Sequence, residues 1–279
     1  MRRPRAWSPA RLARYWGKEL AFAGCRAVAF LDRSAPAPAR VILAYHSHSP
    51  LSPWGVGVGT FERQIDLLAA RFRVVPLRDL PLTPQDPADP VASVTFDDGY
   101  LDNVLLSLPV LERRGVRATF FLVPSLLGRT LRTRHGEEPL MTPTQARELV
   151  ERGHEVGSHG LSHARVAGLP RDRAWQEIAD SRRALEDLVQ APVTSFAYPF
   201  GRHDAAAREM VREAGYDRAV TTGDAVVPAS PDPYSLPRLS VGRDVGMVQF
   251  RGKLTPAVHV YERLVRRRPP AGAGRAEGR

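Results

Sequence analysis

Two adjacent carboxylates, Asp97 and Asp98, follow the apolar run of residues 91–96 and are followed at once by a glycine. The run is typical of a buried strand, and parallel α/β proteins hold their active sites at the carboxyl ends of strands. Neighbouring carboxylates repel each other, and a bound cation relieves that repulsion. Successive side chains of an extended backbone point in opposite directions, so one aspartate can bind a metal while the other stays free. A solvated Asp-Asp-Gly turn is the alternative interpretation.

Two histidines, His159 and His163, follow a second strand-like run at residues 154–158. Side chains four positions apart can share one face of a helical turn. Two imidazoles and a carboxylate form a typical zinc or non-haem iron site. A pair of polar loop histidines is the alternative, but it explains poorly why Asp97 and Asp98 occupy an equivalent strand end.

These two motifs, Thr95-Phe96-Asp97-Asp98-Gly99 and His159-x-x-x-His163, closely resemble the first two motifs of the polysaccharide deacetylase family, also called the NodB-homology or carbohydrate esterase 4 family. The resemblance implies that Asp98, His159 and His163 bind one divalent metal ion, usually zinc. It implies that Asp97 is the general base.

A third motif of that family resembles Tyr198-Pro199-Phe200-Gly201. The resemblance implies that Tyr198 and Pro199 belong to a wall of the substrate groove. It also implies that the backbone N–H of Phe200 helps to hold the oxyanion. The family's arginine, which orients the base, is missing, and Ala197 stands near its place. Arg238 could supply that charge from another strand, with a surface arginine as the alternative.

The family's last motif, L-x-x-H, is absent after residue 236 but matches Leu43-Ala44-Tyr45-His46 near the start of the domain. This order resembles the circularly permuted deacetylases that act on poly-N-acetylglucosamine and related exopolysaccharides. It implies that His46 is the general acid, that Leu43 lines the substrate site, and that the strand before His46 lies beside the strand before Asp97. His48 is a weaker candidate acid.

Three other histidines read as structural or solvated: His135, His154 and His203.

Strands and helices alternate from residue 40 onward. Strands are expected at residues 41–45, 91–96, 117–123, 154–158, 194–197, 218–221 and 239–241. Helices are expected at residues 61–70, 102–113, 142–152, 171–189 and 204–214. Such alternation predicts a parallel sheet with crossover helices. About seven strands match a (β/α) barrel in size, and an open doubly wound sheet is the competing architecture. The resemblance implies that the barrel is of the irregular (β/α)7, NodB-like type.

The net charge of +10 lies at the two ends of the chain: residues 1–33 carry +6, residues 263–279 carry +5, and residues 34–262 are close to neutral. This distribution favours contact with an anionic membrane surface, or simple solvation, over a nucleic-acid groove, so no nucleic-acid partner is expected. The expected parts are a basic N-terminal helical arm and linker (1–38), one catalytic barrel (39–255), and a basic C-terminal helix with a disordered tail (256–279).

No run reaches the ~18 apolar residues of a membrane span. Arg26 interrupts the best segment, residues 20–31, and thereby also weakens a secretory signal. A cytoplasmic location, with peripheral membrane association as an option, is therefore expected over a secreted or envelope location. Cys25 is the single cysteine, which excludes a disulfide within the chain.

The resemblance to the polysaccharide deacetylases implies a metal-dependent hydrolase that removes N-acetyl groups from an exopolysaccharide or cell-envelope glycan and releases acetate. An esterase or amidase acting on another acylated substrate is one alternative. A non-catalytic glycan-binding protein on the same barrel is the other.

Overall fold

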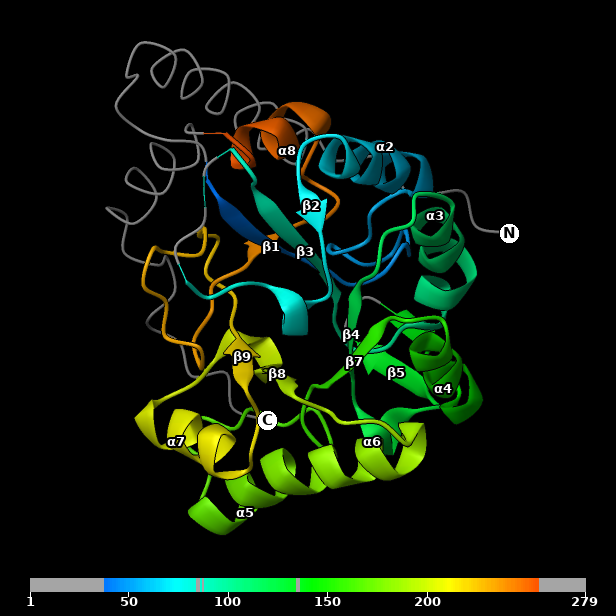
Figure 1. The fold of residues 1–279 in the computed structure, drawn as a ribbon. Coiled ribbons are helices and arrows are strands. Elements are labelled where there is room, and N and C mark those ends of the chain that lie inside the picture. Colours follow the sequence, from blue (N-terminus) through cyan, green and yellow to red (C-terminus); the bar gives the residue numbers. More distant parts are fainter. Residues whose placement is uncertain (1–37, 84–85, 87, 134–135, 256–279) are drawn as a thin grey trace, which may run out of the picture.

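The computed structural model describes residues 38–83, 86, 88–133 and 136–255 (Figure 1). The predicted N-terminal arm and C-terminal tail lie outside the described residues, except for residue 38. Within the described part of the chain, no helix is long and apolar enough to cross a membrane.

The centre of the fold is a curled parallel sheet. Its strands are β1 (Arg40–Tyr45), β2 (Arg73–Val74), β3 (Val91–Phe96), β4 (Thr119–Leu122), β7 (Glu155–Ser158), β8 (Ser195–Ala197), β9 (Arg218–Val220) and β10 (Leu239–Ser240). Their order is β10-β1-β3-β4-β7-β8-β9, with β2 also paired to β3. Every predicted strand is present with similar bounds. The two-residue β2 is too short to leave a pattern in the sequence.

The two edges of the curled sheet are linked by the segment at residues 236–240. Leu236 forms an isolated parallel bridge with Val220 of β9. Three positions later, Leu239 pairs with Leu43 of β1. The segment therefore contacts both edges, which confirms the predicted NodB-like barrel over an open doubly wound sheet.

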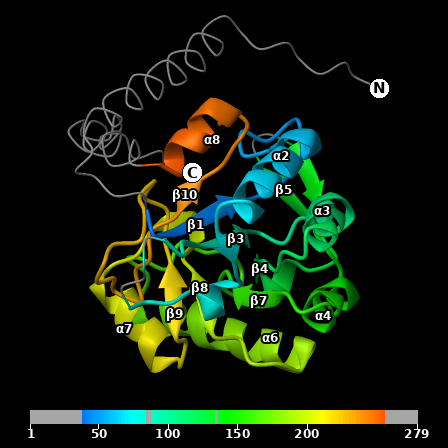
Figure 2. The ribbon, with the colours of Figure 1, turned by 45° about the horizontal axis from the view of Figure 1, so that its top comes forward.

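Helices cover the outside of the sheet (Figure 2). The α-helices are α2 (Val58–Ala69), α3 (Leu108–Arg113), α4 (Pro143–Glu151), α5 (Arg171–Trp175), α6 (Ser181–Val189), α7 (Ala205–Glu213) and α8 (Met247–Lys253). Short 3₁₀ turns are η1 (Leu77–Asp79), η3 (Pro124–Leu126) and η5 (Pro199–Gly201), and π-helical turns are η2 (Asn103–Ser107) and η4 (Gln176–Asp180).

Local sequence signals account for several helix ends. Thr142 accepts a hydrogen bond from the Gln145 N–H while the Gln145 side chain accepts one from the Thr142 N–H, a reciprocal cap that starts α4. Asp204 caps α7 by accepting from the N–H of Ala207. Gly115 adopts a φ of 62° just after α3, where a side chain would be strained.

The strands are buried along most of their length because helices cover the outer face of the sheet and strand side chains such as Ile42, Phe121 and Val220 pack together on the inner face. Phe96 and Phe120, on adjacent strands, stack with ring centroids 4.9 Å apart. This core holds the strand ends in register, and the functional side chains extend from those ends.

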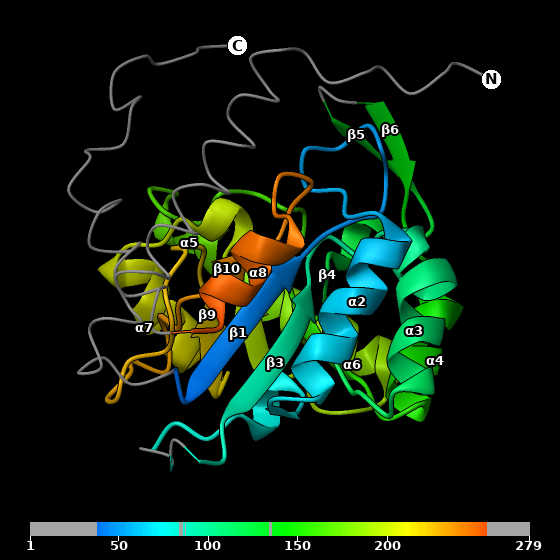
Figure 3. The ribbon, with the colours of Figure 1, turned by 90° about the horizontal axis from the view of Figure 1, so that it is seen from above.

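A polar hairpin that the sequence did not suggest projects beyond the sheet, formed by β5 (Thr130–Thr133) and β6 (Gly136–Pro139) (Figure 3). Most of its described side chains are exposed or half-buried, so no apolar alternation marks it as a strand pair.

Candidate active site

The carboxyl ends of the strands surround a cavity of about 570 Å³. β1 runs parallel to β3 with Tyr45 opposite Phe96, so His46 and Asp97 extend side by side from neighbouring strands. This is the neighbourhood that the permuted L-x-x-H motif predicts. The residues on the cavity wall include His46, Asp97, Asp98, His159, His163 and Phe200.

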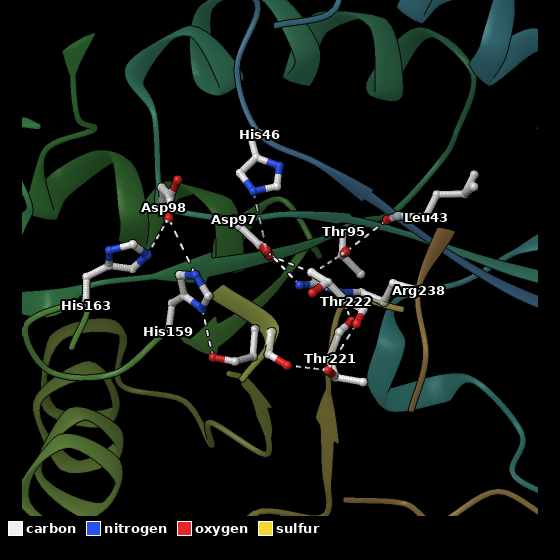
Figure 4. Close-up of polar contacts among 12 residues, drawn as sticks. Leu43, His46, Thr95, Asp97, Asp98, His159, His163, Thr221, Thr222 and Arg238 are labelled. Atoms are coloured by element: carbon white, nitrogen blue, oxygen red, sulfur yellow. Dashed lines mark hydrogen bonds and ion pairs between the residues drawn. The ribbon is translucent and has the colours of Figure 1, made fainter. Parts of the chain in front are cut away.

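Asp98, His159 and His163 converge at the rim of the sheet (Figure 4). Oδ1 of Asp98 lies 3.2 Å from Nε2 of His163 and 3.5 Å from Nε2 of His159. One potential ligand atom from each residue lies within 4.8 Å of the others. Nδ1 of His159 is hydrogen-bonded to the carbonyl oxygen of Ala197 at 2.8 Å, which leaves Nε2 free for a metal. The donor set therefore fits a divalent ion.

The charge states of His159 and Asp98 also suit a metal. Burial lowers the pKa of His159 to about 4, so its ring is neutral at physiological pH. Burial alone would raise the pKa of Asp98, but the hydrogen bond with His163 and the nearby imidazoles hold it well below its usual range. A neutral imidazole and an ionised carboxylate are the forms that bind metal ions.

Asp97 forms a buried ion pair with Arg238. Nη1 and Nη2 of Arg238 each donate to one carboxylate oxygen at 2.7 Å. The guanidinium also donates to Oγ1 of Thr95 at 3.0 Å and to the carbonyl of Thr221 at 3.1 Å. Arg238 is fully buried, so the alternative of a surface arginine is wrong.

The ion pair determines the charge state of Asp97. Burial would raise the pKa of this carboxyl, but Arg238 and His159 outweigh burial and lower the pKa below its usual value. Asp97 is therefore ionised at neutral pH, as a general base must be.

His46 faces the same carboxylate from β1. Its Nε2 lies 3.9 Å from Oδ2 of Asp97 (Figure 4). The indole of Trp54 stacks on the His46 ring with centroids 5.3 Å apart. His48 instead contacts the carbonyl of Val56 and the hydroxyl of Ser107, each at 2.6 Å, and does not line the cavity. Of the two histidines, His46 has the position of a candidate acid.

Three residues at the site adopt left-handed backbone conformations although none is glycine. The φ angles are 71° for Asp98, 65° for His163 and 60° for Phe200. Such conformations are costly for side chains with a Cβ and concentrate at functional sites. The Phe200 ring lies 4.7 Å from the ring of His163, one of the candidate metal ligands.

The structure corrects three predicted substrate contacts. Leu43 is fully buried, and its side chain points away from the Asp98 cluster (Figure 4). Tyr198 is also fully buried, and its hydroxyl donates to the carbonyl of Tyr234 at 3.0 Å. Pro199 is buried as well, and none of the three lines the cavity. The side chains of all three residues are instead packed in the interior of the fold.

The two remaining histidines in the described part of the chain, His154 and His203, lie outside the cavity wall. His154 is buried, and its Nδ1 accepts from the N–H of Ala118 at 3.1 Å. Nε2 of His203 pairs with the hydroxyl of Ser235 at 3.0 Å. His135 lies outside the described residues.

Sequence reasoning missed several residues on the cavity wall, among them Trp54, Tyr100 and Glu138. Tyr100 directly follows the Asp97-Asp98-Gly99 turn, and that position was its only sequence signal. Trp54 and Glu138 belong to a loop and a hairpin that no periodic pattern marks.

Comparisons with known proteins agree with this geometry. Residues 85–219 match the sequence model of the family described as "Polysaccharide deacetylase". YxkH of Bacillus subtilis (strain 168), assigned to the polysaccharide deacetylases, is 29% identical over 73% of this chain and 72% of its own length. The peptidoglycan-N-acetylglucosamine deacetylase PgdA of Listeria monocytogenes is 26% identical over 49% of this chain, which spans 26% of that protein.

Two solved structures share the fold. IcaB from Ammonifex degensii superposes with a TM-score of 0.66 at 22% identity, covering 79% of this chain and 99% of IcaB. The Streptococcus pyogenes deacetylase PplD, solved with acetate, superposes with a TM-score of 0.64 at 21% identity, covering 79% of this chain and 100% of PplD. The sequence matches confirm the predicted resemblance to the polysaccharide deacetylases, whose names agree with the predicted enzyme class, and the two solved structures confirm the predicted fold.

Proposed function

We propose that this member of the polysaccharide deacetylase family is a metal-dependent hydrolase that removes N-acetyl groups from a glycan and releases acetate. One observation carries the proposal: Asp98, His159 and His163 converge beside the Asp97–Arg238 pair and His46, in a single cavity. A metal-ligand set, an ionised carboxylate and an imidazole within reach of one substrate are the groups that amide hydrolysis requires.

Asp97 is the proposed general base. Its carboxylate is ionised, and Arg238 holds both oxygens in a fixed plane. A water attacking the acetyl carbonyl would lose its proton to Asp97. Because the ion pair is buried, the base keeps its orientation without a reorganisation cost during the reaction.

The ion would be held by Asp98, His159 and His163, and when bound it would supply Lewis-acid activation of the water and the acetyl carbonyl. We expect zinc, because two imidazoles and one carboxylate with open positions are typical of catalytic zinc sites. We propose that the backbone N–H of Phe200, whose ring contacts the ring of His163, donates to the developing oxyanion.

His46 is the proposed general acid. His46 and Arg238 approach Asp97 from different sides (Figure 4), and Nε2 of His46 lies 3.9 Å from Oδ2 of the carboxylate. An amine is a poor leaving group unless it is protonated, so a proton from His46 would complete cleavage of the C–N bond.

Exposed aromatic side chains on the cavity wall support a sugar substrate. The side chains of Trp54 and Phe200 are 47% and 57% exposed and both line the cavity. Apolar ring faces that remain exposed in a binding site suit the C–H faces of sugar rings. The names of the relatives point to N-acetylated envelope glycans, and we extend that class to this chain.

Acetate release from a panel of N-acetylated oligosaccharides tests the proposal. We expect release by the protein as isolated, loss on treatment with a chelator, and recovery when zinc is restored. An O-acetylated sugar in the same panel distinguishes an esterase from an amidase. Acetate release that persists after the metal has been removed, or no release from any glycan by the zinc-loaded protein, would contradict the proposal.

A further inference from the structure

A buried glutamate on the polar hairpin, Glu138, faces the cavity. Along β6, Glu137 and Pro139 are exposed whereas Glu138 is 6% exposed, as expected for alternating strand side chains. Glu137 pairs with Arg132 across the hairpin at 2.9 Å, on the solvent side. The two adjacent glutamates therefore have different surroundings on the same strand.

The hairpin is fixed to the turn that carries the candidate metal ligand. Leu140, just after β6, forms an antiparallel bridge with Tyr100. The N–H of Met141 donates to the carbonyl of Gly99 at 2.9 Å. Glu138 therefore has a defined position relative to Asp98, the residue that precedes Gly99.

The Glu138 carboxylate is only half satisfied. Oε2 accepts a hydrogen bond from the hydroxyl of Ser47 at 2.9 Å. Oε1 is buried and has no hydrogen-bond partner among the described residues. An unpaired buried acceptor is costly and is found in native proteins mostly where function requires it.

The charges around Glu138 are mainly acidic. Burial raises the pKa of its carboxyl, and the carboxylates of Asp102 and Asp98 raise it further, against hydrogen bonds with the side chains of Ser47 and Ser49. A donor group brought by a ligand would relieve both the unpaired oxygen and the crowding of negative charge.

We infer that Glu138 is a specificity-determining residue, whose Oε1 accepts a hydrogen bond from a hydroxyl or ammonium group of the bound glycan. The inference rests on the proposed function, because it takes the occupant of the cavity to be a glycan. The contact lies on the hairpin side of the metal-ligand cluster, and the donor belongs to the sugar placed there. Glu138 thereby selects which glycan binds and takes no part in the proton transfers.

Glu138→Gln and Glu138→Ala variants, compared with Glu137→Gln as the matched control, test the inference. The substrates are a fully acetylated chitopentaose and the same oligomer after partial deacetylation. We expect Glu138→Ala to lower kcat/KM by about tenfold to a hundredfold through KM, the effect of losing a hydrogen bond to a charged group. Glu137→Gln should match the unsubstituted protein.

The two oligomers distinguish the donor. A hydroxyl donor predicts a loss on both substrates, with partial retention by Glu138→Gln, whose amide oxygen still accepts. An ammonium donor predicts a loss confined to the partially deacetylated oligomer and equal in both variants. Titration of each variant with both oligomers by calorimetry gives a readout that is independent of turnover.

Unchanged glycan affinity and KM in both Glu138 variants, with acetate release intact, would overturn the inference and leave the proposed function standing. A fall in kcat with loss of bound zinc would assign Glu138 a structural role instead and overturn it as well. If the unsubstituted protein neither binds glycans nor releases acetate, both the inference and the proposed function fail.

Discussion

Arg238 binds both carboxylate oxygens of Asp97 at 2.7 Å, although 141 positions separate the two residues in the chain. Arg238 lies in the segment that links β9 to β1, and Asp97 directly follows β3. The conjecture that Arg238 compensates for the missing arginine near Ala197 thus acquires a geometric basis. Residues 236–240 close the curled sheet between β9 and β1, and this closure brings the guanidinium of Arg238 to the carboxylate of Asp97.

Arg238→Lys should retain the fold and lower turnover, because a lysine supplies the charge but cannot hold both oxygens in one plane. Arg238→Met should lose about 3–5 kcal/mol of stability, since a buried carboxylate is left without its partner. Burial raises the pKa of Asp97 and Arg238 lowers it, so this pKa should rise in either variant. A base acts only when deprotonated, so the acid limb of the pH–rate profile should move to higher pH. An acid limb that stays at the same pH in both variants would contradict the role of Arg238 in lowering the pKa of the base.

Asp97→Asn should keep the metal and lose turnover by on the order of 10²–10⁴, because the amide cannot accept the proton. Metal content by atomic spectroscopy and acetate release, measured on one preparation, check both parts. Loss of metal in this variant would mean that the roles of Asp97 and Asp98 are reversed. Asp98→Asn is the companion variant, and it should lose metal affinity.

His46→Ala should keep the metal and lose most activity on N-acetyl substrates. An O-acetyl ester should suffer less, because an alkoxide leaving group needs less protonation than an amine. The measurement is kcat for paired amide and ester substrates. His48→Ala is a control with a residue that does not line the cavity, and an equal loss on both substrates for His46→Ala would argue against its role as the acid.

The buried side chain of His154 should make the free energy of unfolding depend on pH, whether or not a metal is bound. Burial and the nearby Arg117 lower its pKa to about 4, so the folded protein binds fewer protons than the unfolded chain below its ordinary pKa. Stability should therefore fall as the pH drops from about 6.5 towards 4, by up to about 3 kcal/mol from this group. Urea unfolding at pH 7 and pH 4.5 measures the change, and His154→Asn should reduce it. An identical pH dependence in the variant would contradict the prediction.

The basic residues 1–33 predict weak, salt-sensitive binding to anionic vesicles, at ~1 kcal/mol for each well-placed basic residue. This proposal concerns a part of the chain outside the described residues and rests on charge alone. Deletion of residues 1–34 should abolish sedimentation with phosphatidylserine vesicles and leave glycan deacetylation unchanged. Equal sedimentation of the shortened protein would remove the proposal, together with the expected peripheral association of a cytoplasmic enzyme.

The sequence by itself determined the site residues and helix ends whose positions depend only on neighbouring residues along the chain. Asp97 and Asp98 follow one buried strand and His159 follows another, and strand ends in a parallel sheet must meet at one edge. Period and capping signals located the described helices other than α8, such as the helix that begins at the predicted cap Thr142. The L-x-x-H motif at His46 placed β1 beside β3, and the register of Tyr45 with Phe96 agrees with that placement.

Only the tertiary structure decided which distant groups complete the site. Whether Arg238 pairs with Asp97 or faces solvent depends on how the sheet closes, which no local pattern specifies. The same holds for Glu138, because a polar hairpin gains its orientation from long-range contacts such as that of Leu140 with Tyr100. Leu43 and Tyr198 were misplaced for a related reason: a motif locates a residue along the chain, but packing determines which face of a strand end its side chain occupies.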